Sequence, residues 1–167
     1  MSNRIIKSHG GSFRLLDALK SLIILEVLNP SEEIYFFSPW ITNAPIIKNR
    51  KKVNDLFPFA EGENITLKRF IRHCIWRGSR VRIISKVEGE NTKIFYNDLK
   101  KEIDFKRLKQ EHEKGLITDN FYIHGSMNFT YSGIYINGEK VRITTEESEI
   151  NQALLSAKAM WEDAEKL

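Results

Sequence analysis

The sequence contains a single cysteine, Cys74, among its 167 residues, and it shows no group of cysteines and histidines at the spacing of a metal site. One cysteine cannot close an intramolecular disulfide, and a zinc site built on cysteine needs ligands that are missing here. These absences favour a reducing, cytoplasmic environment. They also predict that the protein works without a bound metal or another cofactor.

Long apolar runs are equally scarce. The most apolar stretch, residues 15–28, is interrupted by Asp17, Lys20 and Glu26, whereas a membrane-spanning helix needs about 20 mostly apolar residues. Residues 1–11 lack the apolar segment of a secretory signal. With 41% hydrophobic residues, the chain can still bury one core. We expect a polar N-terminal arm over residues 1–12, a single domain over residues 13–167 and no membrane partner.

Positive charge is concentrated in one part of the chain, although the net charge is only +4. Residues 45–86 contain eleven basic and three acidic side chains, whereas residues 144–167 contain six acidic and two basic ones. This asymmetry favours a polyanion as the partner of one face. On charge alone, a solvated surface that binds nothing fits equally well. The basic residues that we expect to contact a nucleic-acid backbone are Lys51, Lys52, Lys68, Arg69, Arg72 and Arg77.

The hydrophobic pattern alternates between helical and strand-like segments. Apolar residues recur at helical spacing over residues 13–28, and Asn29-Pro30 ends that helix. The apolar run 33–38 is typical of a central strand whose C-terminal end leads into a loop. A helix beginning at Asn64 and stopping at Gly78, followed by a strand over residues 80–86, completes a β-α-β unit.

The second half of the chain predicts more strands. Residues 119–120 and 137–138 have hairpin-turn chemistry, while residues 41–63 show no sustained period and are expected to be a surface excursion. Further elements are expected, in chain order, at residues 90–103 (helix), 105–108, 112–118 and 121–124 (strands), and after Ser148 (helix). The pattern therefore predicts an α/β domain with a mixed β-sheet flanked by helices.

A group of polar residues between positions 112 and 139 has the composition of a phosphoryl-transfer site. Its members are His112, Lys114, Asp119, the turn Gly125-Ser126-Met127-Asn128, and Glu139. If His112 and Lys114 lie on one strand, the two-residue period points both side chains to the same face. A nucleophile or proton carrier would then lie beside a fixed positive charge, an arrangement that suits a phosphate.

The order and spacing of this group resemble the signature of the phospholipase D-like superfamily, here His112-x-Lys114-x-x-x-x-Asp119, then Gly125-Ser126-x-Asn128 and Glu139. The resemblance implies the phospholipase D-like fold and a metal-independent reaction in which His112 attacks phosphorus and forms a phosphohistidine. Such an attack is reasonable when a carboxylate holds the other ring nitrogen of the imidazole, because the carboxylate stabilises the positive charge that develops.

The resemblance also implies a role for each remaining residue. Glu139 is the carboxylate that would hold His112. Lys114 and the amide of Asn128 would donate to the non-bridging phosphate oxygens. Ser126 would add a hydroxyl hydrogen bond, whereas Asp119 would organise the strand turn rather than meet substrate.

The family reaction needs two histidines, one to attack and one to protonate the leaving oxygen, and this sequence carries one motif and no internal repeat. By resemblance to single-motif nucleases of the superfamily, we expect a homodimer in which two copies of His112 share one phosphate. The expected substrate is nucleic acid, with DNA favoured over RNA, and endonucleolytic cleavage is the expected reaction. Proteins of a phage-defence or restriction system are further expected partners.

Other interpretations of the same residues stay open. The chain could be a lipid enzyme, which would need an apolar entry surface, or a non-catalytic nucleic-acid-binding subunit of a larger complex. His124 lacks a lysine two positions later and is not expected to act directly, and His73 is expected at the surface of a basic helix face. Trp40, Trp76 and Trp161 are expected to pack, although Trp40 could also line the mouth of the site.

Overall fold

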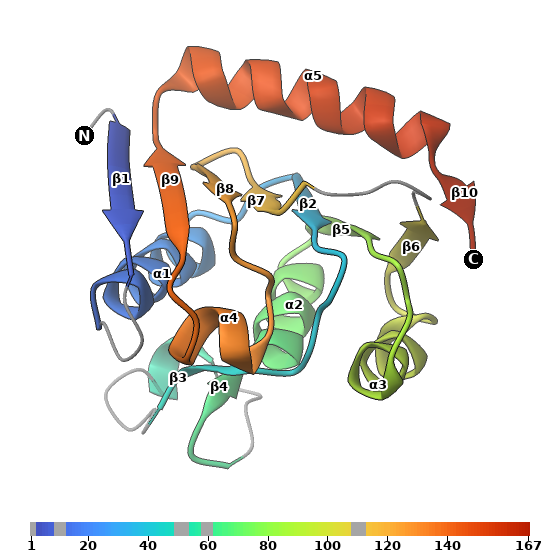
Figure 1. Ribbon diagram of the computed structural model, residues 1–167, viewed down its shortest axis with the longest axis horizontal. Helices are drawn as coiled ribbons and strands as arrows, with labels where there is room; N and C mark the ends of the chain where they lie inside the picture. The colour runs from blue at the N-terminus through green and yellow to red at the C-terminus, as the bar shows by residue number, and fades with distance from the viewer. Residues whose placement is uncertain (1–2, 9–12, 49–53, 58–61, 108–112) are drawn as a thin grey trace.

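The computed structural model describes residues 3–8, 13–48, 54–57, 62–107 and 113–167. Strands from both ends of the chain join one mixed sheet, in the order β1-β9-β8-β7-β2-β5-β6-β10 (Figure 1). The strands are β1 (Asn3–Lys7), β2 (Glu33–Phe37), β5 (Arg80–Ile84), β6 (Asp104–Arg107), β7 (Gly115–Ile117), β8 (Tyr122–Gly125), β9 (Lys140–Thr144) and β10 (Glu165–Lys166). The pairs β2–β5 and β5–β6 are parallel and the other pairs are antiparallel.

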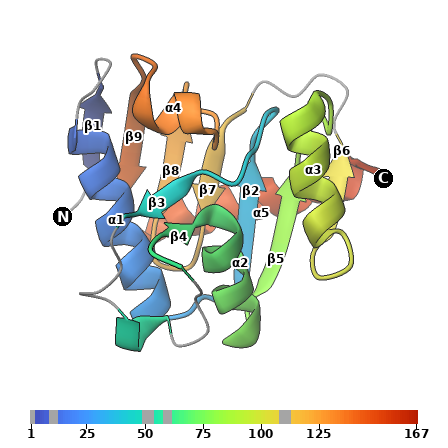
Figure 2. The ribbon, with the colours of Figure 1, turned by 90° about the horizontal axis from the view of Figure 1, so that it is seen from below.

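Helices cover both faces of this sheet. Helices α1 (Phe13–Leu28), α2 (Leu67–Trp76) and α3 (Glu90–Leu99) lie on one face, and α5 (Glu147–Asp163) crosses the other (Figures 1 and 2). The short helix α4 (Tyr131–Tyr135) lies at one end of the sheet, between β8 and β9 in the chain. None of the helices in the described ranges is long and apolar enough to cross a bilayer.

Strand β2 shows why the sheet is buried on both faces. Ile34 and Phe36 point into the core beneath α1 and α2, whereas Tyr35 and Phe37 point into the core beneath α5. A strand buried on both faces is a continuous apolar run, as its sequence predicts. The predicted α/β class, with a mixed sheet flanked by helices, is confirmed.

Several predicted elements are confirmed as well. Helix α1 has the predicted bounds, β2 and β5 pair in parallel as the β-α-β unit requires, and β7 and β8 form a hairpin around residues 118–121. Gly78, with a φ of 97°, follows the C-terminal end of α2 as expected. The predicted C-terminal helix begins at Glu147.

The prediction of an arm over residues 1–12 is wrong for residues 3–7, because these residues pair with β9 over the whole of β1. Ile6 is buried and Ile5 is exposed, so the strand presents one apolar side chain to the core. Pairing with a strand more than a hundred residues away leaves no local signal in such a polar segment. Ser8 follows β1 and is described, whereas residues 1–2 and 9–12 of the predicted arm lie outside the described residues.

The described residues of the segment 41–63 also form structure that the sequence does not predict. Its described residues include β3 (Pro45–Ile47), which pairs with β4 (Ile65–Thr66), and the 3-10 helix η2 (Asn54–Leu56). Ile46, Ile47 and Phe57 are buried. Helix α2 consequently starts at Leu67 with Thr66 as its N-cap residue, so the prediction of Asn64 as the cap is wrong.

Candidate active site

Three described members of the motif lie at one end of three neighbouring strands. Lys114 immediately precedes β7, Ser126 immediately follows β8, and Glu139 immediately precedes β9. Because β7, β8 and β9 are antiparallel neighbours, these three positions fall at the same end of the sheet. The carbonyl of Lys114 accepts a hydrogen bond from the N–H of Gly125 at 3.1 Å, which extends the β7–β8 pairing to the motif. His112 lies outside the described residues.

The alternation of β7 assigns Lys114 to one face of the sheet. Leu116 belongs to the core beneath α1 and α2, and Ile117 belongs to the core beneath α5. Lys114, two positions before Leu116, therefore falls on the α1–α2 face. On β8 the side chain of Tyr122 packs on the core beneath α5, so His124 falls on that opposite face.

His124 has its own surroundings. It lines a cavity of about 490 Å³ against α5, together with Glu113, Arg142 and Glu149. Burial lowers the pKa of His124, and the charge of Arg142 lowers it further. His124 therefore lies on the opposite face of the sheet from Lys114.

Glu139 is the best-fixed acidic group of the motif. Its carboxylate belongs to a residue only 8% exposed, and it accepts hydrogen bonds from the hydroxyl of Ser126 and, at 3.3 Å, from the amide of Asn137. The oxygen of Ser126 also accepts from the N–H of Lys140 at 3.0 Å. Both functions of the Ser126 hydroxyl are thus engaged in fixing Glu139 and the start of β9.

Ser8 holds Glu139 from the other side. Its N–H donates to the carbonyl of Glu139 at 2.7 Å, and its hydroxyl oxygen accepts from the N–H of Glu139 at 2.9 Å. Ser8 directly follows β1, so the β1–β9 pairing delivers it to the motif. Sequence reasoning missed this residue because it lay in the expected arm, and no motif or local period marks it.

The glycine of the Gly-Ser-x-Asn turn is required by a close approach to β9. Gly125 has a φ of 153°, and a Cβ atom there would lie 2.1 Å from the carbonyl oxygen of Lys140. Any larger residue would push β8 away from β9 at the point where Ser126 meets Glu139.

Asn128 is oriented by the loop that follows β2. The N–H of Trp40 donates to Oδ1 of Asn128 at 3.4 Å, so the NH₂ group of this amide is the end available to a ligand. The hydroxyl of Ser38 fixes the same loop, because it donates to the carbonyl of Trp40 at 2.6 Å and accepts from the N–H of Phe129 at 3.0 Å. Trp40, Asn128 and Asn137 line one open cavity of about 450 Å³.

Asp119 lies at the far end of β7 from Lys114. Its carboxylate accepts from the N–H of Glu32 at 2.8 Å, and its own N–H donates to the hydroxyl of Ser31 at 2.9 Å. These bonds tie the β7–β8 turn to the start of β2. The geometry agrees with the expectation that Asp119 organises the turn.

The basic residues of α2 are divided between ion pairs and backbone contacts. Lys68 pairs with Asp98 at 2.5 Å and Arg72 pairs with Glu102 at 2.7 Å, both on the side of α3. Arg69 donates to the carbonyl of Asn64.

Lys68 also lines a cavity that adjoins the cavity beside Asn128. The two cavities share Thr42, Asn91 and Tyr131. Arg77 follows the C-terminal end of α2, where its guanidinium donates to the carbonyl of Val27. Lys51 and Lys52 lie outside the described residues.

The prediction that His73 lies at the surface is wrong. His73 is 8% exposed and packs between the rings of Phe57 and Trp76, at centroid distances of 5.1 and 5.5 Å. Phe57 belongs to the segment that the sequence did not predict to pack, which explains the error. Burial lowers the pKa of His73, with a further contribution from the charge of Arg77.

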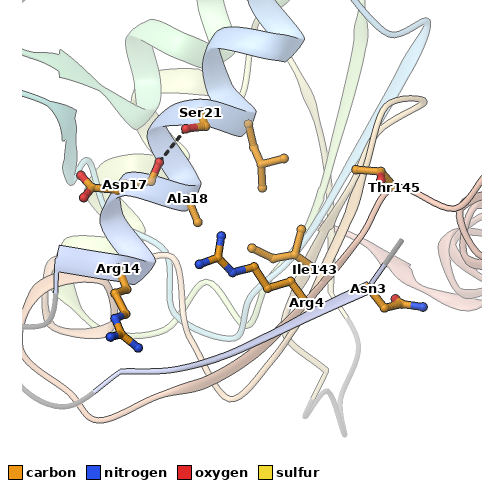
Figure 3. A pocket seen from close by; sticks show the side chains of 9 residues that line it. Asn3, Arg4, Arg14, Asp17, Ala18, Ser21, Ile143 and Thr145 are labelled. Carbon is orange, nitrogen blue, oxygen red and sulfur yellow. Dashed lines mark hydrogen bonds between the residues drawn. The ribbon is translucent and has the colours of Figure 1, made fainter. Parts of the chain in front are cut away.

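A different cavity, of about 530 Å³, lies between α1 and the β1–β9 edge of the sheet. Figure 3 shows Arg4 extending from β1 toward α1 and Arg14 in the first turn of α1, with Ile143 and Ala18 between the two elements. No residue of the motif lines this cavity. Within the described ranges, no three histidine, cysteine, aspartate or glutamate side chains gather in a way that could hold a metal ion.

Comparisons with known proteins give a clear result for structure and none for sequence. No family model and no curated protein matches the sequence. Among solved structures, Nuc from Salmonella typhimurium, a phospholipase D family member, is similar with a TM-score of 0.66 and 18% identity, over 99% of this chain and 97% of that one. NucT from Helicobacter pylori is similar with a TM-score of 0.64 and 19% identity, over 99% and 98%.

A third similar structure is that of TrmBL2, an archaeal chromatin protein with a novel mode of DNA binding. Its TM-score is 0.57 and its identity 16%, over 100% of this chain and 55% of that one. The near-complete overlap with Nuc in both directions includes the sheet and both helical layers. The protein therefore has the fold of the phospholipase D family.

Proposed function

We propose that the protein is a phosphodiesterase that cleaves nucleic acid through a phosphohistidine formed on His112. The observation that carries the proposal is the buried Glu139, whose carboxylate is held by Ser126 and Asn137 and whose backbone is held by Ser8. It lies at the sheet end where Lys114 and Asn128 also lie. A fixed carboxylate beside an amide donor and a lysine supplies the groups that a histidine nucleophile needs at phosphorus.

In the proposed first step, a ring nitrogen of His112 forms a bond to phosphorus while the bond to the leaving oxygen breaks. Glu139 accepts the N–H of the other ring nitrogen and stabilises the charged imidazole. Lys114 and the NH₂ group of Asn128 donate to the non-bridging oxygens. In the second step, water attacks phosphorus and gives a proton to the group that protonated the leaving oxygen, the phosphorus–nitrogen bond breaks and His112 is regenerated.

The leaving oxygen needs a proton in the first step, and we infer that it comes from His112 of a second subunit. The sequence has one motif, and His124, the nearest alternative in sequence, falls on the opposite face of the sheet. A two-fold pair of subunits would supply the second histidine. We further propose that DNA is the preferred nucleic acid, that cleavage is endonucleolytic and that the protein acts in the cytoplasm, within a phage-defence or restriction system.

A second candidate function is nucleic-acid binding without cleavage. The similarity to TrmBL2 favours this alternative, because that protein shares the fold and binds DNA. The basic residues of α2 would serve either function. Only a reaction at His112 separates the two.

The test is an assay of labelled DNA, RNA and phosphatidylcholine with the wild-type protein, His112→Ala and the control His124→Asn. We expect cleavage of nucleic acid by the wild type and by His124→Asn and none by His112→Ala. Cleavage of phosphatidylcholine would contradict the proposal and show that the protein is a lipid enzyme. Binding of DNA without cleavage by any variant would replace it by the binding function.

A further inference from the structure

The cavity beside Asn128 contains an exposed tryptophan held in a fixed position. Trp40 is 40% exposed although it lies in a loop that hydrogen bonds fix on both sides, through Ser38 and Asn128. The backbone of Gly89 packs against its ring: a Cβ atom on Gly89 would lie 3.3 Å from the six-membered ring, and its φ of 72° favours glycine. The indole is thus supported by backbone on one side and open to the cavity.

A second aromatic side chain borders the same cavity. Tyr131 is 47% exposed and stacks on Tyr135, with ring centroids 4.7 Å apart and planes inclined by 22°. Tyr135 is fixed in turn, because its hydroxyl donates to the carbonyl of Pro45 at 2.6 Å and the ammonium of Lys48 lies 4.5 Å from its ring. Tyr131 is therefore the exposed ring of an anchored stack.

The other groups around this cavity are small or polar. Thr42, Asn91, Thr92, Thr130 and Ser132 offer hydroxyl and amide groups, and Glu90 is the acidic member of the described lining. Exposed aromatic faces among amide and hydroxyl groups suit a nucleobase, which has a flat apolar face and a polar edge. An acyl chain would leave these polar groups unsatisfied.

We propose that Trp40 and Tyr131 form a stacking surface for an unpaired base next to the scissile phosphate, so that the substrate is single-stranded nucleic acid. The inference rests on the proposed function. Asn128 connects the stacking surface with the phosphate site, because its Oδ1 accepts a hydrogen bond from the N–H of Trp40 while its NH₂ group is available to the phosphate. In a duplex, each base face is covered by the neighbouring pairs, so a duplex cannot offer a base to these rings without unstacking.

Binding measurements on the His112→Ala protein test the inference without cleavage of the ligand. The ligands are a labelled single strand, the same strand in a duplex, and the same strand with abasic positions, which keeps the phosphates and removes the bases. Trp40→Ala and Trp40→Phe are compared in this background. Trp76→Ala is the matched control, because Trp76 is 56% exposed on α2 and does not line the cavity. Circular dichroism confirms that each variant is folded.

We expect Trp40→Ala to weaken single-strand binding roughly five- to 150-fold, the range of one lost base stack. Trp40→Phe should restore most of that affinity, and Trp76→Ala should leave it unchanged. On the abasic strand the loss caused by Trp40→Ala should disappear. An equal loss on intact and abasic strands, or tighter binding of the duplex, would overturn the inference.

Cleavage assays on the wild-type protein keep the two proposals distinguishable. If His112-dependent cleavage occurs but single strand and duplex are cut at equal rates, the stacking inference fails and the proposed function stands. If no nucleic acid is cut, the assignment of a substrate fails together with the proposed function, whatever the binding measurements show.

Discussion

Ser8 and Glu139 stand 131 positions apart in the chain and hold each other through two hydrogen bonds, at 2.7 and 2.9 Å. The first residue after β1 thus fixes the residue before β9, whose carboxylate also accepts from Ser126. The N-terminal strand is therefore part of the support of the candidate site.

Replacing Ser8 by alanine should slow cleavage and lower stability. The variant leaves the buried N–H of Glu139 without its acceptor, which costs about 1–3 kcal/mol of unfolding free energy. Because Ser8 acts on substrate only through Glu139, we expect kcat to fall while KM changes little. Ser21→Ala, an exposed serine on α1 whose hydroxyl bonds to the carbonyl of Asp17, is the control. Equal kcat values for the two variants would show that Ser8 does not position Glu139.

Mixing wild-type and His112→Ala subunits should reveal whether the site is shared. After equal amounts exchange at random, only wild-type pairs work if each reaction needs both histidines, and activity per dimer falls to about one quarter. If each subunit carries a complete site, about one half remains. The measurement is initial rate against mutant fraction, after native mass spectrometry confirms exchange. A linear decrease contradicts the shared site.

Cleavage should persist in the presence of EDTA, because the proposed chemistry uses the charge of Lys114 and the amide of Asn128 in place of a metal ion. Stopping the reaction with acid-free denaturant should trap a phosphorylated protein, detectable by mass spectrometry at His112. His112→Ala is the matched control and should carry no phosphoryl group. Strict dependence on an added metal would contradict the phosphohistidine mechanism.

Replacing Lys68, Arg69 and Arg72 together by alanine should weaken binding to many sequences alike. Exposed ion pairs are worth about 1 kcal/mol or less, so the partners of Lys68 and Arg72 do not prevent these side chains from meeting phosphate. The dependence of log Kd on log salt should flatten by about 0.7 per lost contact with a single strand. Lys158→Ala, on α5, is the control, and an unchanged slope in the triple variant would mean that this face does not bind phosphate.

The reverse change should strengthen binding. Asp98→Asn with Glu102→Gln removes both acidic partners of α2, so Lys68 and Arg72 keep their charge and lose their competitors. We expect a lower Kd at low salt, measured by fluorescence anisotropy with the same single strand. A higher Kd would indicate that α3 is needed to position these cations.

Burial of His73 should make the protein less stable in mild acid. Its folded-state pKa lies below the ordinary value of 6.5, so the unfolded state binds more protons as the pH falls through that value. Stability is therefore retained above about pH 6.5 and decreases below it. Between about pH 7.5 and 5.5, His73→Leu should lose less unfolding free energy than the wild type. His124→Asn is measured in parallel, because the pKa of His124 is also lowered and this residue contributes to the same loss of stability in acid. Equal losses of unfolding free energy in His73→Leu and the wild type would contradict the prediction.

The sequence determined the elements whose signals are local. The apolar period of α1, the unbroken apolar run of β2 and the turn at Asp119-Asn120 depend on neighbours within a few positions, and each is found where the pattern predicts it. The spacing of the motif in the sequence also places its residues, because Lys114, Ser126 and Glu139 lie next to the ends of consecutive antiparallel strands.

Tertiary structure decided the contacts that join distant segments. β1 forms only because β9 offers an edge to residues 3–7, and the burial of His73 depends on Phe57. The same holds for the support of the site, where Ser8 reaches Glu139 and Trp40 reaches Asn128. A hydrogen bond between a backbone N–H and a side chain 88 or 131 positions away leaves no period in the chain, because its geometry exists only after the sheet has brought the two segments together.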